Sequence, residues 1–342
     1  MINILSNLRF PSSWRCCGTG GTSVYVHNFG ELTRNLRASD LIIVNGLETT
    51  LKVCELFSIA PWLRKPLVAV DVVLRKPETL RNRVSAKITR HLLRNVDYFL
   101  HYFCDLEGYE KYFDVTPERS GYVPFKPNLR HRVELQPKAD GEYVLCIGHS
   151  MRDYDTFFEA VGRLPYPAAI PNPDSRELSN HRSRFTLAIS DLPVNVRMLP
   201  DDESQESLVR ILCGAKMVVL PILKSNICAS GVGIYLNSML LGKCVVISRG
   251  PGASDVLTDQ AIFFEPENAE DLATTIRRVW KDDSLRTATA AAGYNYALSL
   301  GGEPELCERV LDNTVRWYAE QCSRNALFRS DLTSAIGLRR VG

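Results

Sequence analysis

Short apolar runs of four to seven residues alternate along this chain with amphipathic segments of helix length. A strand followed by a crossover helix produces such an alternation, and successive βα units build a parallel sheet with helices on its faces. The chain has 342 residues, more than one hydrophobic core usually supports. We therefore expect an α/β protein with two Rossmann-like, doubly wound domains that face a cleft.

The first half is expected to hold strands separated by helices of ten or more residues. The predicted strands are Ile2–Leu8, Asp40–Asn45, Pro66–Val73, Asp97–Phe103 and Ser120–Pro124. The predicted helices are Glu48–Leu63, Glu78–Asn95 and Leu106–Phe113.

The alternation stops at Lys126–Gly141, where prolines and charges predict a linker, and then restarts. Strands are predicted at Glu142–Gly148, Val194–Met198, Met217–Leu220, Cys244–Ser248 and Ala261–Glu265. Helices are predicted at Asp155–Leu164, Glu203–Ala215, Gly233–Leu241, Ala253–Leu257 and Ala269–Trp280. Doubly wound sheets bind ligands at the carboxyl ends of their strands, so we expect the site in the cleft between the two domains.

Composition narrows the class of protein. No stretch approaches the ~20 consecutive apolar residues that span a bilayer. The first residues do not form a signal peptide, so a cytoplasmic protein is expected, with peripheral contact at the inner membrane face as a further option. The net charge of +2 and the absence of a reader motif argue against nucleic-acid binding. The ten cysteines have no zinc-ligand spacing, so we expect free thiols and no metal.

The segment from Gly231 onward carries the most informative pattern. It runs Gly-Val-Gly-Ile-Tyr-Leu-Asn-Ser-Met-Leu-Leu-Gly-Lys-Cys-Val-Val, then reaches Gly250-Pro251-Gly252 and ends in Phe263-Phe264-Glu265-Pro266 before a helix. This order resembles the donor-binding region of glycosyltransferase family 4, the group 1 glycosyltransferases. The resemblance implies the two-domain GT-B fold and a hexosyltransferase-like, metal-independent enzyme that transfers sugar with retention.

A second match begins at Val144 and includes Gly148, His149 and Arg152. It resembles the opening of the family's second domain, where an arginine and a lysine face the donor diphosphate. The resemblance places Arg152 at the lysine position, as a catalytic and donor-binding residue, and His149 at the arginine position. The alternative interpretation is that Arg152 is a surface residue paired with Asp153 or Asp155.

The turn Ser230-Gly231-Val232-Gly233 precedes an apolar helix. Free N–H groups at a helix N-terminus bind phosphate, and glycine lets the phosphate approach the backbone, so Ser230, Gly231 and Gly233 are donor-binding candidates. The alternative is that the glycines only terminate a strand. The family's ribose-binding glutamate falls on Asn237, and its other glutamate has no counterpart because Leu223–Ser230 contains no acid.

Two candidates come from the first half. The cluster Gly18-Thr19-Gly20-Gly21 follows the first strand where the family has a glycine loop, so Gly20 and Gly21 are predicted to bind donor, with a plain flexible loop as the alternative. Asp71 ends a predicted strand where many relatives carry a histidine in the cleft. It is a catalytic or acceptor-binding candidate, or else a helix cap or salt-bridge partner.

A basic helix face is the last feature. Four cations recur at helical spacing beside an apolar stripe of Val84, Ile88, Leu92 and Val96. A solvated face is the default interpretation, and a surface for anionic lipid or an anionic acceptor is the sharper one. The cations are Arg83, Lys87, Arg90 and Arg94.

The resemblance assigns a role to each part of the chain. Residues 1–130 would form the acceptor domain, 131–141 a linker and 142–300 the nucleotide-sugar-binding domain. Residues 301–325 would form a helix that crosses back to the first domain, and 326–342 a tail. The expected donor is UDP- or GDP-linked, with no other cofactor, and the acceptor is lipid-linked, a saccharide or a small molecule. A non-catalytic nucleotide-sugar-binding protein and a nucleotide-sugar epimerase are the alternatives.

Overall fold

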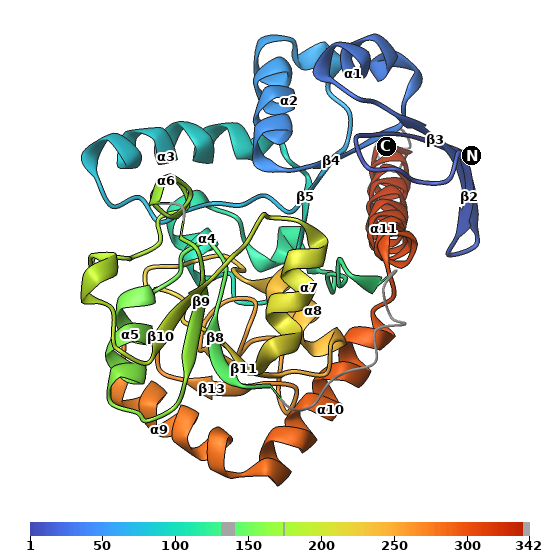
Figure 1. Cartoon of the computed structure of the whole chain (residues 1–342). Helices are drawn as coiled ribbons and strands as arrows, with labels where there is room; N and C mark the ends of the chain where they lie inside the picture. Colours follow the sequence, from blue (N-terminus) through green and yellow to red (C-terminus); the bar gives the residue numbers. More distant parts are fainter. Residues whose placement is uncertain (131–140, 174, 338–342) are drawn as a thin grey trace. The chain divides into compact units, whose positions relative to one another are not determined.

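The computed structural model describes residues 1–130, 141–173 and 175–337, with Figure 1 colouring them along the chain. The contacts within it define two compact units. The first consists of Met1–Val72, Leu92–Leu100 and Cys307–Gly342, and the second of Val73–His91 and His101–Leu306. Each unit is therefore assembled from separate stretches of chain.

The N-terminal sheet has seven strands in the order β2-β3-β1-β4-β5-β6-β7. Residues Leu41–Val44 and Leu67–Val70 in its central strands are completely buried, and such continuous apolar runs are typical of strands inside a parallel sheet. The neighbours of β1 and β4 run parallel to them, whereas β2 and β3 form an antiparallel hairpin. The strands are β1 (Ile2–Ser6), β2 (Ser13–Cys16), β3 (Thr19–Tyr25), β4 (Leu41–Asn45), β5 (Leu67–Val70), β6 (Tyr98–His101) and β7 (Ser120–Tyr122).

Four helices occur between these strands, and a long helix ends the described chain. They are α1 (Phe29–Asn35), α2 (Leu47–Ile59), α3 (Leu80–Leu92), α4 (Glu107–Phe113) and α11 (Glu303–Gly337). Helix α11 contributes buried residues such as Val310 and Val315 to the first unit. Its Trp317 stacks on Tyr98 of β6, with ring centroids 5.1 Å apart.

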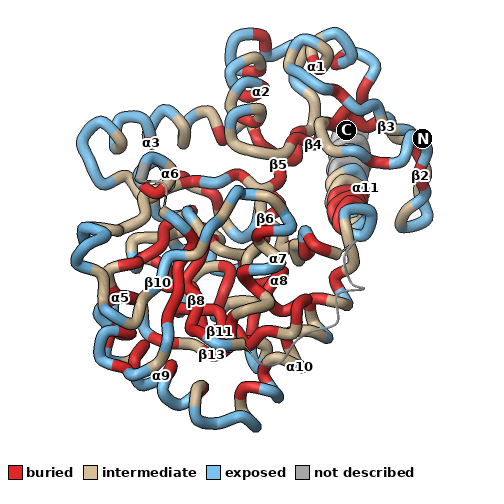
Figure 2. Tube along the Cα trace, viewed as in Figure 1, coloured by how far each residue is buried: buried red, intermediate tan, exposed pale blue. Residues whose placement is uncertain are grey.

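The C-terminal sheet has six strands in the order β10-β9-β8-β11-β12-β13, and every neighbouring pair is parallel. Figure 2 shows its inner strands as almost continuously buried. The strands are β8 (Tyr143–Cys146), β9 (Ala168–Pro171), β10 (Val196–Leu199), β11 (Ala215–Leu220), β12 (Cys244–Ser248) and β13 (Ile262–Phe264). The helices are α5 (Tyr154–Gly162), α6 (Ser175–Asn180), α7 (Gln205–Gly214), α8 (Val232–Leu240), α9 (Ala269–Lys281) and α10 (Asp283–Ser299).

The predicted fold class, two α/β units with parallel sheets, is confirmed. The short helix predicted at Ala253–Leu257 is wrong, because these residues form turns and a connecting segment. The glycine loop predicted at Gly20 and Gly21 is instead part of strand β3. The prediction missed the β2–β3 hairpin, β9, α1, α6 and α10, and residues 131–140 of the predicted linker lie outside the described residues. Within the described chain, no helix is long and apolar enough to cross a membrane.

Candidate functional site

The order of strands in the C-terminal sheet fixes where a ligand can enter. From β8 the chain proceeds to β9 and β10 on one side, and then to β11, β12 and β13 on the other. The loops that follow β8 and β11 therefore diverge from adjacent strands. Such a switch point opens a crevice at the carboxyl ends of the strands, which is the usual ligand position in this architecture.

Arg152 occupies this switch point, in the loop after β8. Its side chain is buried, with 1% of the residue exposed. Nε donates to the Ile147 carbonyl at 2.9 Å, and Nη1 donates to the Ser150 carbonyl at 2.8 Å and Ser230 Oγ at 3.4 Å. Burial lowers the pKa of Arg152 from its ordinary value, although a guanidinium stays protonated in proteins.

No carboxylate neutralises Arg152 among the described residues. Asp153 and Asp155, the partners considered from sequence, lie instead beside Arg184. Arg184 Nε donates to Asp153 Oδ1 at 2.9 Å, and Asp153 also accepts from Thr156. The buried positive charge of Arg152 therefore faces only neutral acceptors, and a buried cation of this kind favours an incoming anion.

Two glycines cover the third nitrogen of the guanidinium. A Cβ atom on Gly148 would lie 2.7 Å from Arg152 Nη2, and one on Gly231 would lie 2.8 Å from it. Both glycines have positive φ, +108° and +81°. Nη2 has no hydrogen-bond acceptor within the described chain, so this donor group of the buried cation is unpaired where it packs against the Gly148 and Gly231 backbones.

Gly231 is also the N-cap of α8, and no side chain caps this helix. The first helical hydrogen bond runs from the N–H of Tyr235 to the Gly231 carbonyl. The preceding N–H groups of Val232, Gly233 and Ile234 have no acceptor within the described residues. A positive helix end, open amides and a buried arginine thus converge, which is an arrangement that binds an anion.

A cavity of about 540 Å³ opens on one side of this point. It is lined by the ends of three strands, and His149, which is exposed, lies at its rim. The cavity also takes in Ile234 from the first turn of α8. Sequence reasoning missed the rest of the lining, which includes Pro171, Asn172, Pro173, Glu177, Asp201, Glu203 and Ser204.

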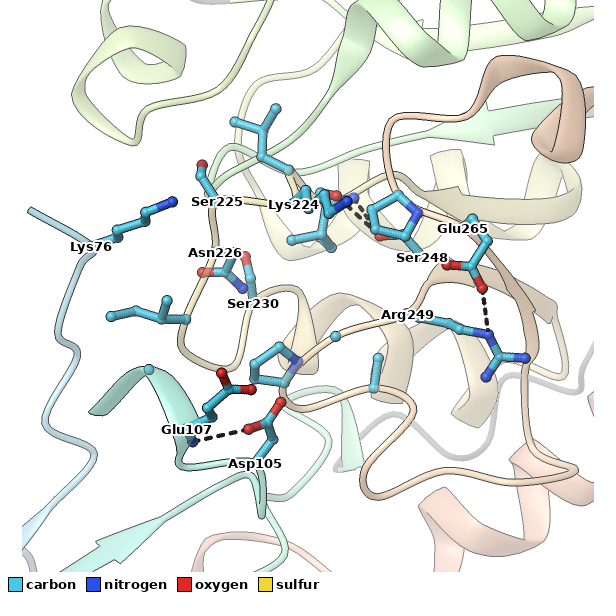
Figure 3. Close-up of a pocket in the computed structure, with 18 of the residues that line it drawn as sticks. Lys76, Asp105, Glu107, Lys224, Ser225, Asn226, Ser230, Ser248, Arg249 and Glu265 are labelled. Carbon is cyan, nitrogen blue, oxygen red and sulfur yellow. Dashed lines mark hydrogen bonds and ion pairs between the residues drawn. The ribbon is translucent and has the colours of Figure 1, made fainter. Parts of the chain in front are cut away.

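A second cavity, of about 360 Å³, opens on the other side and includes Ser230 (Figure 3). The loop after β11 and the end of β12 form one wall, and residues 105–112 form another. Arg249 and Glu265, which both line it, pair at 3.1 Å, and Ser248 Oγ accepts from the Ile222 N–H at 2.8 Å. Arg152 lies behind the lining of both cavities: it donates to Ser230, which lines this one, and packs against Gly148, which lines the other.

Asn237, predicted to bind ribose, is buried on α8 with 2% exposed. Its Oδ1 accepts the N–H groups of Asn128 at 2.8 Å and Leu129 at 3.1 Å. The amide oxygen thus holds the segment that follows β7. In this structure, the acids near the larger cavity are Glu177, Asp201 and Glu203.

The candidates from the first half lie in the other unit. Gly21 pairs with Trp14 in the β2–β3 hairpin, and Gly20 pairs with Arg15. Asp71 follows β5 with a φ of +50°, and its backbone N–H donates to the Leu100 carbonyl. Burial raises the pKa of the Asp71 carboxyl from 3.8 to about 6.

The comparisons with known proteins agree with this architecture. The family model of the group 1 glycosyl transferases matches residues 180–296. A comparison with curated proteins gave no match.

Solved structures are similar over most of the chain. Sucrose-phosphate synthase from Thermosynechococcus elongatus has a TM-score of 0.61 and 13% identity, covering 93% of this chain and 89% of that one. HepE from Anabaena in complex with UDP has a TM-score of 0.60 and 13% identity, with coverages of 84% and 81%. HepE in complex with UDP-glucose has a TM-score of 0.59 and 12% identity, with coverages of 92% and 100%. The chain therefore has the GT-B fold, and its residues 180–296 carry the sequence pattern of the group 1 glycosyltransferases.

Proposed function

We propose that this protein is a glycosyltransferase that takes its sugar from a nucleoside-diphosphate donor. The observation that carries the proposal is Arg152, a buried cation without a carboxylate partner, placed at the switch point between two cavities. A nucleotide sugar has an anionic diphosphate at its centre and a neutral group at each end. Its chemistry thus matches an anion site with a cavity on either side.

The proposed donor position follows from the geometry. The nucleoside occupies the larger cavity, beside Gly148 and His149, and the sugar reaches the cavity lined by Ser230. The diphosphate lies against Arg152 Nη2 and the open amides of α8. UDP is the first nucleotide to test, because HepE was solved with UDP and UDP-glucose.

The same groups would assist bond breaking. As the glycosidic bond lengthens, negative charge develops on the leaving diphosphate, and preorganised donors stabilise it most when they are already desolvated. We propose that Arg152 and the α8 amides perform this task without a metal ion or other cofactor. Retention of the anomeric configuration is proposed from the resemblance to family 4, and Asp71 is proposed as a catalytic group on the acceptor side.

A comparison of UDP with uridine, which lacks the diphosphate, tests the donor site directly. We expect Arg152→Met to weaken UDP binding by roughly 10- to 100-fold, the worth of a charge-assisted hydrogen bond, and to leave uridine binding nearly unchanged. Isothermal titration of UDP and uridine with both proteins measures the difference. Arg184→Met is the matched control, because Arg184, unlike Arg152, is already paired with the carboxylates of Asp153 and Glu267.

Equal losses for UDP and uridine in Arg152→Met would contradict the assignment. Turnover then separates the candidate functions. Slow hydrolysis of UDP-glucose, with the product anomer followed by NMR, is expected of a retaining transferase.

A second function, nucleotide-sugar binding without catalysis, is favoured by one observation. The loop Leu223–Ser230 contains no acid, and the Asn237 amide oxygen is already engaged by backbone. Tight UDP-glucose binding without hydrolysis or transfer would support that alternative. Interconversion of free nucleotide sugars would instead identify an epimerase.

A further inference from the structure

Helix α3 (Leu80–Leu92) presents an apolar stripe to solvent. Leu80 is 79% exposed, Val84 61% and Ile88 59%, and their spacing of four places them on one face of the helix. Ala86 is the only residue of the helix that is buried. Figure 2 shows α3 as exposed along most of its length.

Unpaired cations flank this stripe. Helical spacing places Arg83 and Lys87 along one side of it and Arg81 along the other. All three are exposed, and none has an ion-pair partner among the described residues. No aspartate or glutamate occurs from residue 79 to residue 96. The helix thus carries an apolar line between rows of positive charge.

By helical spacing, the buried Ala86 lies on the side of α3 opposite the stripe. Arg90 pairs with Asp114, the left-handed C-cap of α4, at 3.2 Å. In the segment that leads into the helix, Arg75 donates to the Asn180 carbonyl at 3.2 Å. Both contacts lie within the second unit, and the exposed apolar stripe is on the side of α3 away from its buried residue.

We infer that α3 docks this protein on the surface of an anionic lipid bilayer. Aliphatic side chains of a surface helix enter the boundary between head groups and acyl chains, while flanking Lys and Arg reach the anionic head groups. A stripe one residue wide is narrow for a stable protein interface, which buries on the order of 800 Å² on each partner. The inference does not depend on the proposed transfer reaction.

Vesicle flotation of the full-length protein tests the inference. We expect binding to vesicles that contain phosphatidylglycerol, weak binding to pure phosphatidylcholine, and release as the salt concentration rises. The double variant Arg83→Gln/Lys87→Gln is expected to weaken binding about thirtyfold, since each cation near the surface contributes about a factor of five. Val84→Ser/Ile88→Ser is expected to weaken binding to the same vesicles by at least about tenfold.

Matched variants control for charge and hydrophobicity. Arg277→Gln/Arg278→Gln removes two exposed cations from α9, and Ile189→Ser/Val194→Ser removes two exposed aliphatic residues elsewhere in the same unit. Both controls are expected to float like the wild type. Circular dichroism and thermal unfolding establish that every variant is folded.

Three outcomes would overturn the inference. The first is the absence of binding to the anionic vesicles, and the second is an equal loss of binding in the α9 control and the α3 variant. The third is concentration-dependent self-association that Val84→Ser/Ile88→Ser abolishes while vesicle binding is lacking. That result would assign the stripe to a second copy of this chain.

Discussion

At the scale of single residues, Asp71 has the environment of a functional carboxyl. It follows a buried strand, has the positive φ that few non-glycine residues adopt, and lies largely buried. Within the described chain no ion pair or hydrogen bond reaches its carboxyl group. Burial without a partner favours the neutral acid and raises the pKa to about 6. Such strain and desolvation lower stability and are typical of sites that act on a substrate.

Asp71→Asn is expected to increase stability at neutral pH. The folded pKa lies above the unfolded value, so ionisation opposes folding: the penalty is absent below about pH 4, grows between about pH 4 and 6, and is complete above about pH 6. The shift of about two units corresponds to about 2 to 3 kcal/mol. Asparagine cannot ionise and tolerates positive φ. Urea unfolding across this pH range should therefore show the variant gaining stability only as the pH rises.

The same variant tests the proposed catalytic role. If Asp71 accepts a proton from the acceptor, its removal lowers the transfer rate severely while UDP binding is kept, because the donor site lies in the other unit. A stability difference that does not vary with pH would contradict the raised pKa. Unchanged transfer would leave Asp71 a structural residue.

At the scale of elements, hydrophobic periodicity predicted most strands and helices, because buried parallel strands leave continuous apolar runs such as Leu41–Val44. It failed at the β2–β3 hairpin, where the cluster of glycines led to the prediction of a loop. The reason is local packing: a Cβ on Gly21 would lie 2.0 Å from the Ile2 carbonyl oxygen and 2.4 Å from Trp14 Cζ2. Gly21 is therefore required by close contact inside the sheet, which the one-dimensional pattern does not encode.

Gly21→Ala and Gly20→Ala form a matched pair within this strand. In Gly21→Ala the added methyl group would collide with the Ile2 carbonyl oxygen and the Trp14 indole ring. This variant should therefore lower the free energy of unfolding by about 3 kcal/mol or more. The second meets its neighbours at 3.5 Å, an ordinary contact, and should stay within about 1 kcal/mol of the wild type. Thermal denaturation measures both. Weakened UDP binding in Gly20→Ala, with stability unchanged, would support the predicted donor-binding role of this cluster.

The candidate site was predictable to the extent that short motifs carry it. The motif around Gly148 and the turn at Gly231 pointed to Arg152 and to the N-terminus of α8, and the structure brings these groups together. The carbonyl ligands of Arg152 and the lining of the larger cavity were not predictable. They come from strand ends far apart in sequence, such as Asn172 and Asp201, and carry no motif of their own. The ribose role of Asn237 remains a prediction.

At the scale of the whole molecule, neither compact unit is one continuous stretch of the sequence. The chain leaves the first unit after Val72, returns for Leu92–Leu100 and returns again at Cys307. The C-terminal helix α11 is therefore a core element of the unit that contains the N-terminus. Its inner face is buried at Val310, Thr314 and Val315. The resemblance to family 4 had led us to expect a helix at residues 301–325 that crosses back to the first domain.

A single substitution in α11 should separate the stabilities of the two units. Val315 is fully buried, so Val315→Asp places an unpaired charge in the core of the first unit, at an expected cost of several kcal/mol. Every residue of the proposed donor site belongs to the second unit, so UDP affinity should change little. Hydrogen exchange should rise in peptides from β1, β4 and α11, and stay unchanged in those from β8, β11 and α8.

The control Ala319→Asp adds the same charge on the exposed face of the helix, and it should neither lower stability by this amount nor raise hydrogen exchange. If Val315→Asp raises exchange equally throughout both sheets, or removes UDP binding, the units unfold as one cooperative body and α11 stabilises the whole chain.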